Sequence, residues 1–203
     1  MKQKNSGNSA LIIFAKNPVA GKVKTRLAKD TGSVKALEIF LKLLTHTYNE
    51  TKDLNYQKFL FLSDQLDESL FDKNYIQEIQ SGNNLGEKMK NAFQTIFRSG
   101  FENAVLIGTD TPEISSEIIN KAFVKLSDHD FTIGPAYDGG YYLIGMKKFN
   151  DNLFENIRWS TGEVFEKTIL KIKNLNKSYF ILEKLHDVDV TDDLKYMETL
   201  NIN

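Results

Sequence analysis

The feature that most constrains the fold is the alternation of continuous apolar runs with helical patterns. Residues 10–15 (ALIIFA) are apolar without interruption, as is typical of a strand buried on both faces of a parallel sheet. Residues 34–49 follow with apolar side chains at helical spacing. Recurring alternation of this kind predicts a three-layer α/β/α sandwich with a mixed, mostly parallel sheet. Further strands are expected at 56–63, 75–80, 104–108, 131–133, 141–146 and 179–182, and further helices near 84–96, 118–126, 160–172 and 191–200.

Length and composition fit one domain. The chain has 203 residues, and no linker or repeat divides residues 10–203, which we expect to form a single domain after a disordered segment at 1–9. No apolar run approaches the roughly 18 residues that span a bilayer, so a cytoplasmic protein without a membrane partner is expected. The 26 Lys and Arg nearly balance the 27 Asp and Glu, which disfavours a globally basic nucleic-acid-binding protein.

Cysteine is absent, and only three scattered histidines are present. This excludes Cys nucleophiles, disulfides and Cys-type zinc sites. A bound metal would therefore need carboxylate ligands, which favours Mg²⁺ or Mn²⁺.

The loop at residues 16–27 is the first candidate site, because ligands of open α/β sheets bind beyond the carboxyl ends of the strands. Its four cations and one glycine predict a phosphate-binding loop, although a solvated lysine-rich loop would explain them too. A bound phosphate would also offset the unfavourable position of Arg26 at a helix start. The loop residues in question are Lys16, Gly21, Lys22, Lys24 and Arg26.

Three carboxylates follow predicted strands and could form one metal site. Asp110 comes directly after the apolar run 104–108, where it either binds a metal or caps a turn. Asp187 and Asp189 share one face if their segment is extended. Two such carboxylates repel each other unless a cation lies between them, although acidic enrichment before a helix is the alternative.

Two further motifs have a functional and a structural interpretation. The glycines beside Asp138 let a ligand approach the backbone, or they form a hairpin turn. Trp159 is the only tryptophan, and it could stack on a sugar or base or simply fill the core.

Together these motifs resemble the DUF2064 family. The motifs are FAKxPxxGKxKTRLA (14–28), LGEKM (85–89), IGTDxP (107–112), GPAxDGGYYLIG (134–145), WST (159–161) and DxD (187–189). The family is similar to glycosyltransferases of the GT-A fold, the Rossmann-like fold of nucleotide-diphospho-sugar transferases. It includes types named as radical-SAM- or selenodomain-associated and as arsenosugar-biosynthesis transferases. The first loop and the DxD element are also similar to those of phospholactate and phosphoenolpyruvate guanylyltransferases.

The resemblance implies a role for each motif. The loop cations contact the donor phosphates, and the three carboxylates hold Mg²⁺ or Mn²⁺. The implied nucleotide- and phosphate-binding residues are Lys16, Gly21, Lys22, Lys24, Arg26, Gln80, Leu85 and Gly86. The implied acceptor-binding residues are Asp138, Gly139, Gly140, Tyr141 and Trp159, and the implied metal ligands are Asp110, Asp187 and Asp189. Asp138, Arg26 and Lys24 are the expected catalytic residues.

The leading hypothesis is a metal-dependent glycosyltransferase that moves a sugar from a nucleotide-diphosphate sugar to a small acceptor. The alternative is a nucleotidyltransferase that moves a nucleoside monophosphate from a triphosphate to a small phosphorylated acid. That alternative is favoured by Asp110-Thr111-Pro112, which carries one carboxylate where GT-A glycosyltransferases usually present Asp-x-Asp. A nucleotide-binding module without catalysis and a homodimer are both left open.

Overall fold

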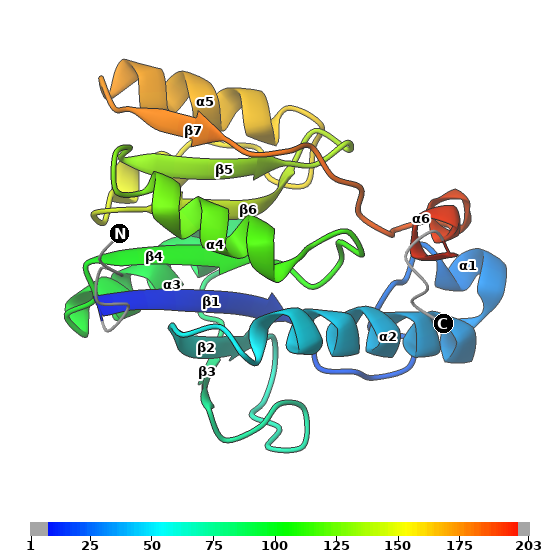
Figure 1. Ribbon diagram of the computed structural model, residues 1–203. Coiled ribbons are helices and arrows are strands. Elements are labelled where there is room, and N and C mark those ends of the chain that lie inside the picture. Colours follow the sequence, from blue (N-terminus) through cyan, green and yellow to red (C-terminus); the bar gives the residue numbers. More distant parts are fainter. Residues whose placement is uncertain (1–7, 199–203) are drawn as a thin grey trace.

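A seven-stranded sheet with helices on both faces forms the framework of the computed structural model, which describes residues 8–198 (Figure 1). The strand order is β3-β2-β1-β4-β6-β5-β7, and only β6 runs antiparallel to its neighbours. The strands are β1 (Ser9–Ala15), β2 (Gln57–Leu62), β3 (Tyr75–Ile79), β4 (Asn103–Ile107), β5 (Phe131–Pro135), β6 (Tyr141–Met146) and β7 (Tyr179–Ile181). The helices are α1 (Ala28–Thr31), α2 (Ser33–Thr51), α3 (Leu85–Arg98), α4 (Ser116–Lys125), α5 (Val164–Asn174) and α6 (Lys195–Glu198), with 3₁₀ turns at η2 (Asp151–Phe154) and η3 (Thr191–Leu194).

The central strand β1 explains why the sheet is covered on both sides. All seven of its residues are buried, and successive side chains point to opposite faces. Leu11 and Ile13 pack with α2 and α4, whereas Ile12 and Phe14 pack with α3 and α5. The expected three-layer arrangement with a mixed, mostly parallel sheet is therefore confirmed. None of the helices in residues 8–198 combines the length and apolar character that a membrane crossing requires.

Two helix starts test the capping predictions. Asn84 accepts a hydrogen bond from the Glu87 amide at 3.0 Å, so the predicted start of α3 is confirmed. The predicted start of α5 at Ser160 is wrong, because the helix begins only at Val164. Ser160 instead adopts a left-handed backbone (φ 62°), which a helix cannot contain.

The ends of the chain need two corrections. The segment 1–9, predicted to be disordered, lies outside the described residues except for its last two, and Ser9 already belongs to β1. Thr191 does not cap the last helix; its hydroxyl donates to Asp30, and the Asp193 carboxylate accepts from the amides of Asp189 and Val190. The end of that helix, predicted at residue 200, lies outside the described residues.

The segment after β7 brings the end of the chain back across the sheet. Figure 1 shows it passing the carboxyl ends of the strands and ending at α6, beside α1. Val188 and Met197 are buried there against Leu27 and the apolar face of α2. The loop at 16–27 and the segment at 187–189 are thereby held against each other.

Candidate active site

Lys24 lies at the centre of the candidate site, at the carboxyl edge of the sheet. Its side chain is only 3% exposed, and its ammonium lies 2.5 Å from Asp110 Oδ1. The same ammonium donates to the Val188 carbonyl at 2.6 Å. A left-handed backbone at Lys24 (φ 46°) accompanies this inward direction. Lys24 thus joins the first loop to the loop after β4 and to the segment after β7.

Asp110, Asp138 and Asp187 lie close enough for their charges to interact. The pKa of Asp187 is raised to about 6, mainly by burial and in smaller part by the negative charges of Asp110 and Asp138. A hydrogen bond from the Thr111 hydroxyl and the charge of Lys24 act in the opposite direction. Asp138 is itself held by the Gly140 amide, which donates to its Oδ1 at 2.7 Å. Three loops therefore contribute one carboxylate each to one region.

Asp189 has a different partner from the other predicted metal ligands. It forms an exposed ion pair with Arg26, with 2.8 Å between Nη1 and Oδ2. In residues 8–198 no three Asp, Glu or His side chains are arranged to hold a metal ion by themselves. The carboxylates of Asp110 and Asp187 are ligands of the kind that Mg²⁺ takes in ones or twos, with phosphates and water completing its shell.

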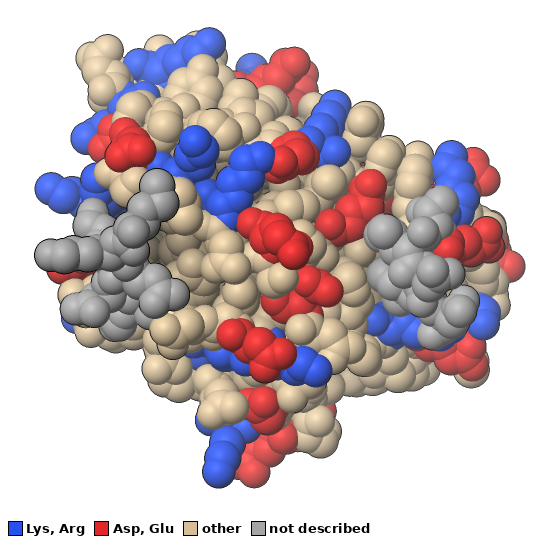
Figure 2. Space-filling model, viewed as in Figure 1, with Lys and Arg blue, Asp and Glu red and all other residues tan. Residues whose placement is uncertain are grey.

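The remaining cations of the first loop are exposed. Lys16, Lys22 and Arg26 all lie on the surface, and Gly21 has a left-handed backbone (φ 81°). Figure 2 shows acidic side chains across the middle of the viewed face, over the start of α4 and the end of α2, with basic side chains around them. Because this face mixes both signs of charge, the attraction of a phosphate depends on the local cations of the loop.

Two residues expected on the nucleotide side make internal contacts. The Gln80 amide donates to the carbonyls of Ala15 and Phe61, which holds the carboxyl ends of β1 and β2 together. A Cβ at Gly86 would lie 2.1 Å from Trp159 Nε1, so the indole fills the space over the start of α3. Leu85, by contrast, is 44% exposed.

The residues expected on the acceptor side divide in the same way. Trp159 is partly buried between Tyr141 and Phe154, which favours its core interpretation. The Tyr141 hydroxyl donates to Met89 Sδ, and burial raises its pKa. A Cβ at Gly139 (φ 89°) would meet the Gly162 carbonyl at 2.1 Å, so close packing of two loops requires this glycine. Asp138 is exposed, as is the preceding Tyr137.

Sequence reasoning missed several residues that order the site. Asn17 is buried, and its side chain bonds Ser63, Asp64 and Gln65 after β2. Glu113 accepts from both the backbone amide and Nδ1 of His186. Their positions just beyond strand ends were a usable signal, but nothing in the sequence identifies their partners.

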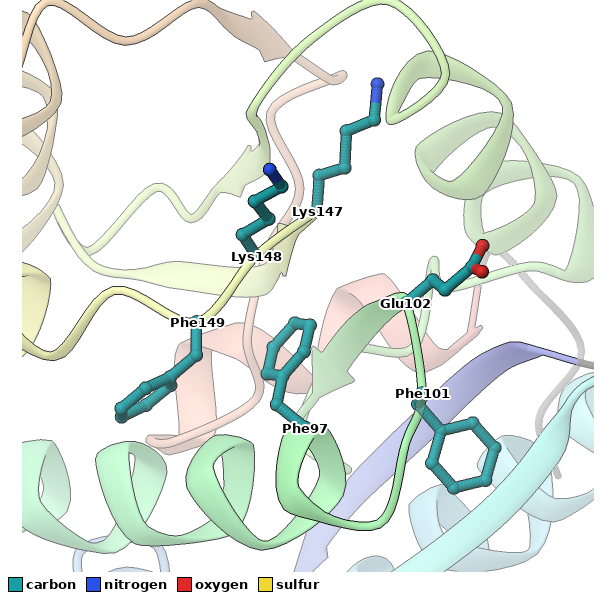
Figure 3. Close-up of a pocket in the computed structure, with 6 residues that line it drawn as sticks. All are labelled: Phe97, Phe101, Glu102, Lys147, Lys148 and Phe149. Carbon is teal, nitrogen blue, oxygen red and sulfur yellow. The ribbon is translucent and has the colours of Figure 1, made fainter.

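A separate cavity of about 420 Å³ lies at the other end of the strands, where β4 begins and β6 ends (Figure 3). Figure 3 shows the ring of Phe97 between those of Phe149 and Phe101, with two lysines above them. The cavity is lined by Phe97, Phe101, Glu102, Lys147, Lys148 and Phe149, none of which belongs to the candidate site.

Comparisons with known proteins connect this geometry to a class. The chain is 32% identical to a protein from Desulfovibrio desulfuricans G20 that is described as a candidate nucleotide-diphospho-sugar transferase; the TM-score is 0.90, covering 96% of this chain and 89% of that one. The inositol-1-phosphate CTP transferase from T. maritima shares the fold at 12% identity, with a TM-score of 0.62 over 98% of this chain and 96% of that one.

A third similarity covers a smaller part of the chain. A tRNA dimethylallyltransferase from Mycoplasmoides gallisepticum is 27% identical in an alignment 135 residues long that covers 61% of this chain and 43% of that protein. The chain therefore spans less than half the length of this curated relative.

Fold and sequence together give this chain the fold of the nucleotide-diphospho-sugar transferases (GT-A). The model of the family described as "Uncharacterized protein conserved in bacteria (DUF2064)" matches residues 48–161, and the chain belongs to this family.

Proposed function

We propose that residues 10–203 form one catalytic domain that transfers a sugar from a nucleotide-diphosphate sugar to a small acceptor with the help of Mg²⁺ or Mn²⁺. The observation that supports this most is the approach of Asp110, Asp138 and Asp187 beside a loop of exposed cations. The similarity of this chain to the Desulfovibrio protein favours a nucleotide-linked sugar as the donor.

The donor phosphates would bind between the first loop and the Asp110–Asp187 pair. A divalent ion held by these two carboxylates would neutralise part of the negative charge on the diphosphate leaving group. Arg26 is exposed and can exchange Asp189 for a phosphate, which its guanidinium binds through two parallel hydrogen bonds. Lys16 and Lys22 add positive charge at the same loop, and Lys24 keeps Asp110 in place.

The acceptor would bind on the side of Asp138. Its carboxylate is exposed and is fixed by the Gly140 amide, so it can orient an acceptor hydroxyl and take its proton. Trp159, Gly139 and Tyr141 would shape this side from behind, since their own contacts are with α3 and with the loop at Gly162.

Nucleotidyl transfer is the second candidate. It is favoured by the shared fold of the T. maritima CTP transferase and by the single carboxylate of Asp110-Thr111-Pro112. Pyrophosphate would then be the leaving group, and the cations of the first loop would stabilise it.

A ligand screen followed by product analysis tests the proposal. Nucleotides and nucleotide sugars are added with and without Mn²⁺, and the unfolding temperature is measured. A ligand at 100 times its dissociation constant stabilises a fold by about 2.7 kcal/mol. Asp110→Asn should remove the Mn²⁺-dependent part of the shift, whereas Asp128→Asn, an exposed carboxylate beyond α4, should keep it.

The products decide the reaction. Release of a nucleoside diphosphate from a nucleotide sugar supports glycosyl transfer, and release of pyrophosphate from a triphosphate supports the second candidate. Nucleotide binding without turnover of any donor would contradict both.

A further inference from the structure

Three aromatic rings from three separate segments form a continuous stack next to the site. The ring of His186 lies 3.9 Å from that of Tyr137 and 3.7 Å from that of Tyr196, measured between centroids, with interplanar angles of 10° and 17°. Lys184 and Lys195 place their ammonium groups 4.7 and 5.0 Å from the centroids of the two tyrosine rings. The faces that the rings turn toward one another are used within the protein, although Tyr137 is still 57% exposed.

The stack joins the same loops that carry the carboxylates. Tyr137 directly precedes Asp138, and His186 directly precedes Asp187. The loop of Asp110 is tied in through Glu113, whose Oε2 accepts from the His186 amide at 2.6 Å and from its Nδ1 at 3.0 Å. The backbone adds one more link, since the Tyr137 amide donates to the Leu185 carbonyl at 3.0 Å.

The stack of rings lies where negative charges repel one another. The Thr111 hydroxyl beside Asp110 donates to Asp187, the Val188 amide donates to the Asp110 carbonyl at 2.9 Å, and the Tyr137–His186 contact brings Asp138 to the same place. The three carboxylates carry like charges, which raise one another's free energy when they approach. Lys24 offsets only part of this charge, because its ion pair is with Asp110 alone. Contacts outside the carboxylate cluster must oppose this repulsion, and the stack and the Glu113 bonds are contacts of that kind, beside the backbone hydrogen bonds between these loops.

We propose that Tyr137, His186 and Tyr196 are positioning residues that hold Asp138 and Asp187 close to Asp110 against their mutual repulsion. The functional meaning of this spacing rests on the proposed function, in which these carboxylates serve the donor and the acceptor. The structural statement, that packing of the rings opposes charge repulsion, can be tested without any ligand.

The test is a double-mutant cycle on stability, measured by urea unfolding at neutral pH, low salt and with chelator present. Tyr137→Leu should increase the unfolding equilibrium constant at least about threefold more in an Asp187→Asn background than in the wild type. In the wild type, loosening the stack also relieves repulsion, and this gain is smaller once the charge of Asp187 is removed. The amide oxygen introduced by Asp187→Asn would still accept the Thr111 hydrogen bond, so the change mainly removes charge.

Matched controls separate positioning from ordinary packing. Tyr137→Phe keeps the ring and should stay within about twofold of wild type. An Asp189→Asn background should leave the Tyr137→Leu effect unchanged, because Asp189 is paired with Arg26. If Tyr137→Leu fails to fold, Tyr196→Leu probes the other end of the stack with the same expectation.

An equal effect of Tyr137→Leu in the wild-type and Asp187→Asn backgrounds would overturn the proposal. Once a donor is known, Tyr137→Leu should lower kcat at least about fivefold relative to wild type, with the KM for the donor within about twofold. Tyr137→Phe should keep the wild-type kcat. A screen that finds no donor would contradict the proposed function but would leave the result of the stability cycle standing.

Discussion

Two ion pairs made by the same loop differ sharply in their surroundings. Lys24 and Arg26 are two residues apart, and each pairs with a carboxylate from a distant segment. The side chain of Lys24 is 3% exposed, whereas that of Arg26 is 68% exposed. Lys24 has a second partner, the Val188 carbonyl, and Arg26 has only Asp189 among the described contacts of its side chain.

The difference shows how one cationic loop can hold a site together and still leave a group for the substrate. A buried ammonium that loses its partners carries a large penalty, so Lys24 is fixed in place. An exposed ion pair contributes little and exchanges partners readily. The inner pair therefore supports the architecture of the site, and the outer pair is the one that a phosphate can displace.

The largest expected effect is the loss of stability on removing the inner cation. Lys24→Met should lower the free energy of unfolding by about 2–4 kcal/mol, because the Val188 carbonyl loses its donor and Asp110 is left beside Asp187 without compensation. Arg26→Met is the matched variant and should cost at most about 0.5 kcal/mol. Urea unfolding of both proteins measures the contrast, and equal losses would contradict the distinction between the two pairs.

A smaller change in the free energy of unfolding, of opposite sign, is expected when the charge of Asp187 is removed. Its folded pKa of about 6 lies above that of an ordinary carboxyl, so the neutral form favours the fold. Stability from this group is complete below the unfolded pKa of about 4 and is lost as the pH rises through about 6. Asp187→Asn should therefore raise the free energy of unfolding at neutral pH by roughly 2 kcal/mol in the presence of chelator, and it should flatten the pH dependence in this window.

The corresponding measurement is a series of urea unfolding curves across this pH range. A variant that is no more stable than wild type at neutral pH, or that keeps the wild-type pH dependence, would show that Asp187 is not under electrostatic strain. Greater stability with lost turnover is the usual sign of a group kept for function.

The third prediction concerns the outer cation in catalysis. Arg26→Lys keeps the charge but loses the two-pronged geometry, so turnover should fall tenfold or more, about 1.4 kcal/mol of transition-state stabilisation. Stability should not change, since the side chain is exposed. Lys22→Ala is the control from the same loop. If Lys22→Ala loses turnover while Arg26→Lys turns over as fast as wild type, the phosphate-binding cation is Lys22.

The smallest effect is expected at Asp189. Asp189→Asn should change the free energy of unfolding by less than about 0.5 kcal/mol, and added salt should remove even this difference. Unfolding curves at low and high salt provide the measurement. A larger, salt-resistant loss would mean that the outer pair is also structural.

Much of the fold could be predicted because its signals are local. The uninterrupted apolar run of β1 and the Asn84–Glu87 capping box each specify a structure from neighbouring residues. The late start of α5 could not be predicted, because the left-handed backbone of Ser160 depends on tertiary contacts. Some features of the site could likewise be predicted from the sequence, and others could not. The positions of Asp110, Asp138 and Asp187 after or between predicted strands could be read from the sequence. The strand order that brings them together could not, and neither could the inward direction of Lys24, which depends on an uncommon backbone conformation.

The packing of Trp159 over Gly86 has a consequence for experiment. Trp159 is the only tryptophan in the chain, so the intrinsic indole fluorescence of the protein reports on the packing of the loop before α5 against the start of α3, Tyr141 and Phe154. Any movement that separates the two would expose the indole to water and shift its emission to longer wavelength. The protein thus contains a built-in optical probe, without added dyes or labels, for whether the acceptor-side loops move when a ligand arrives.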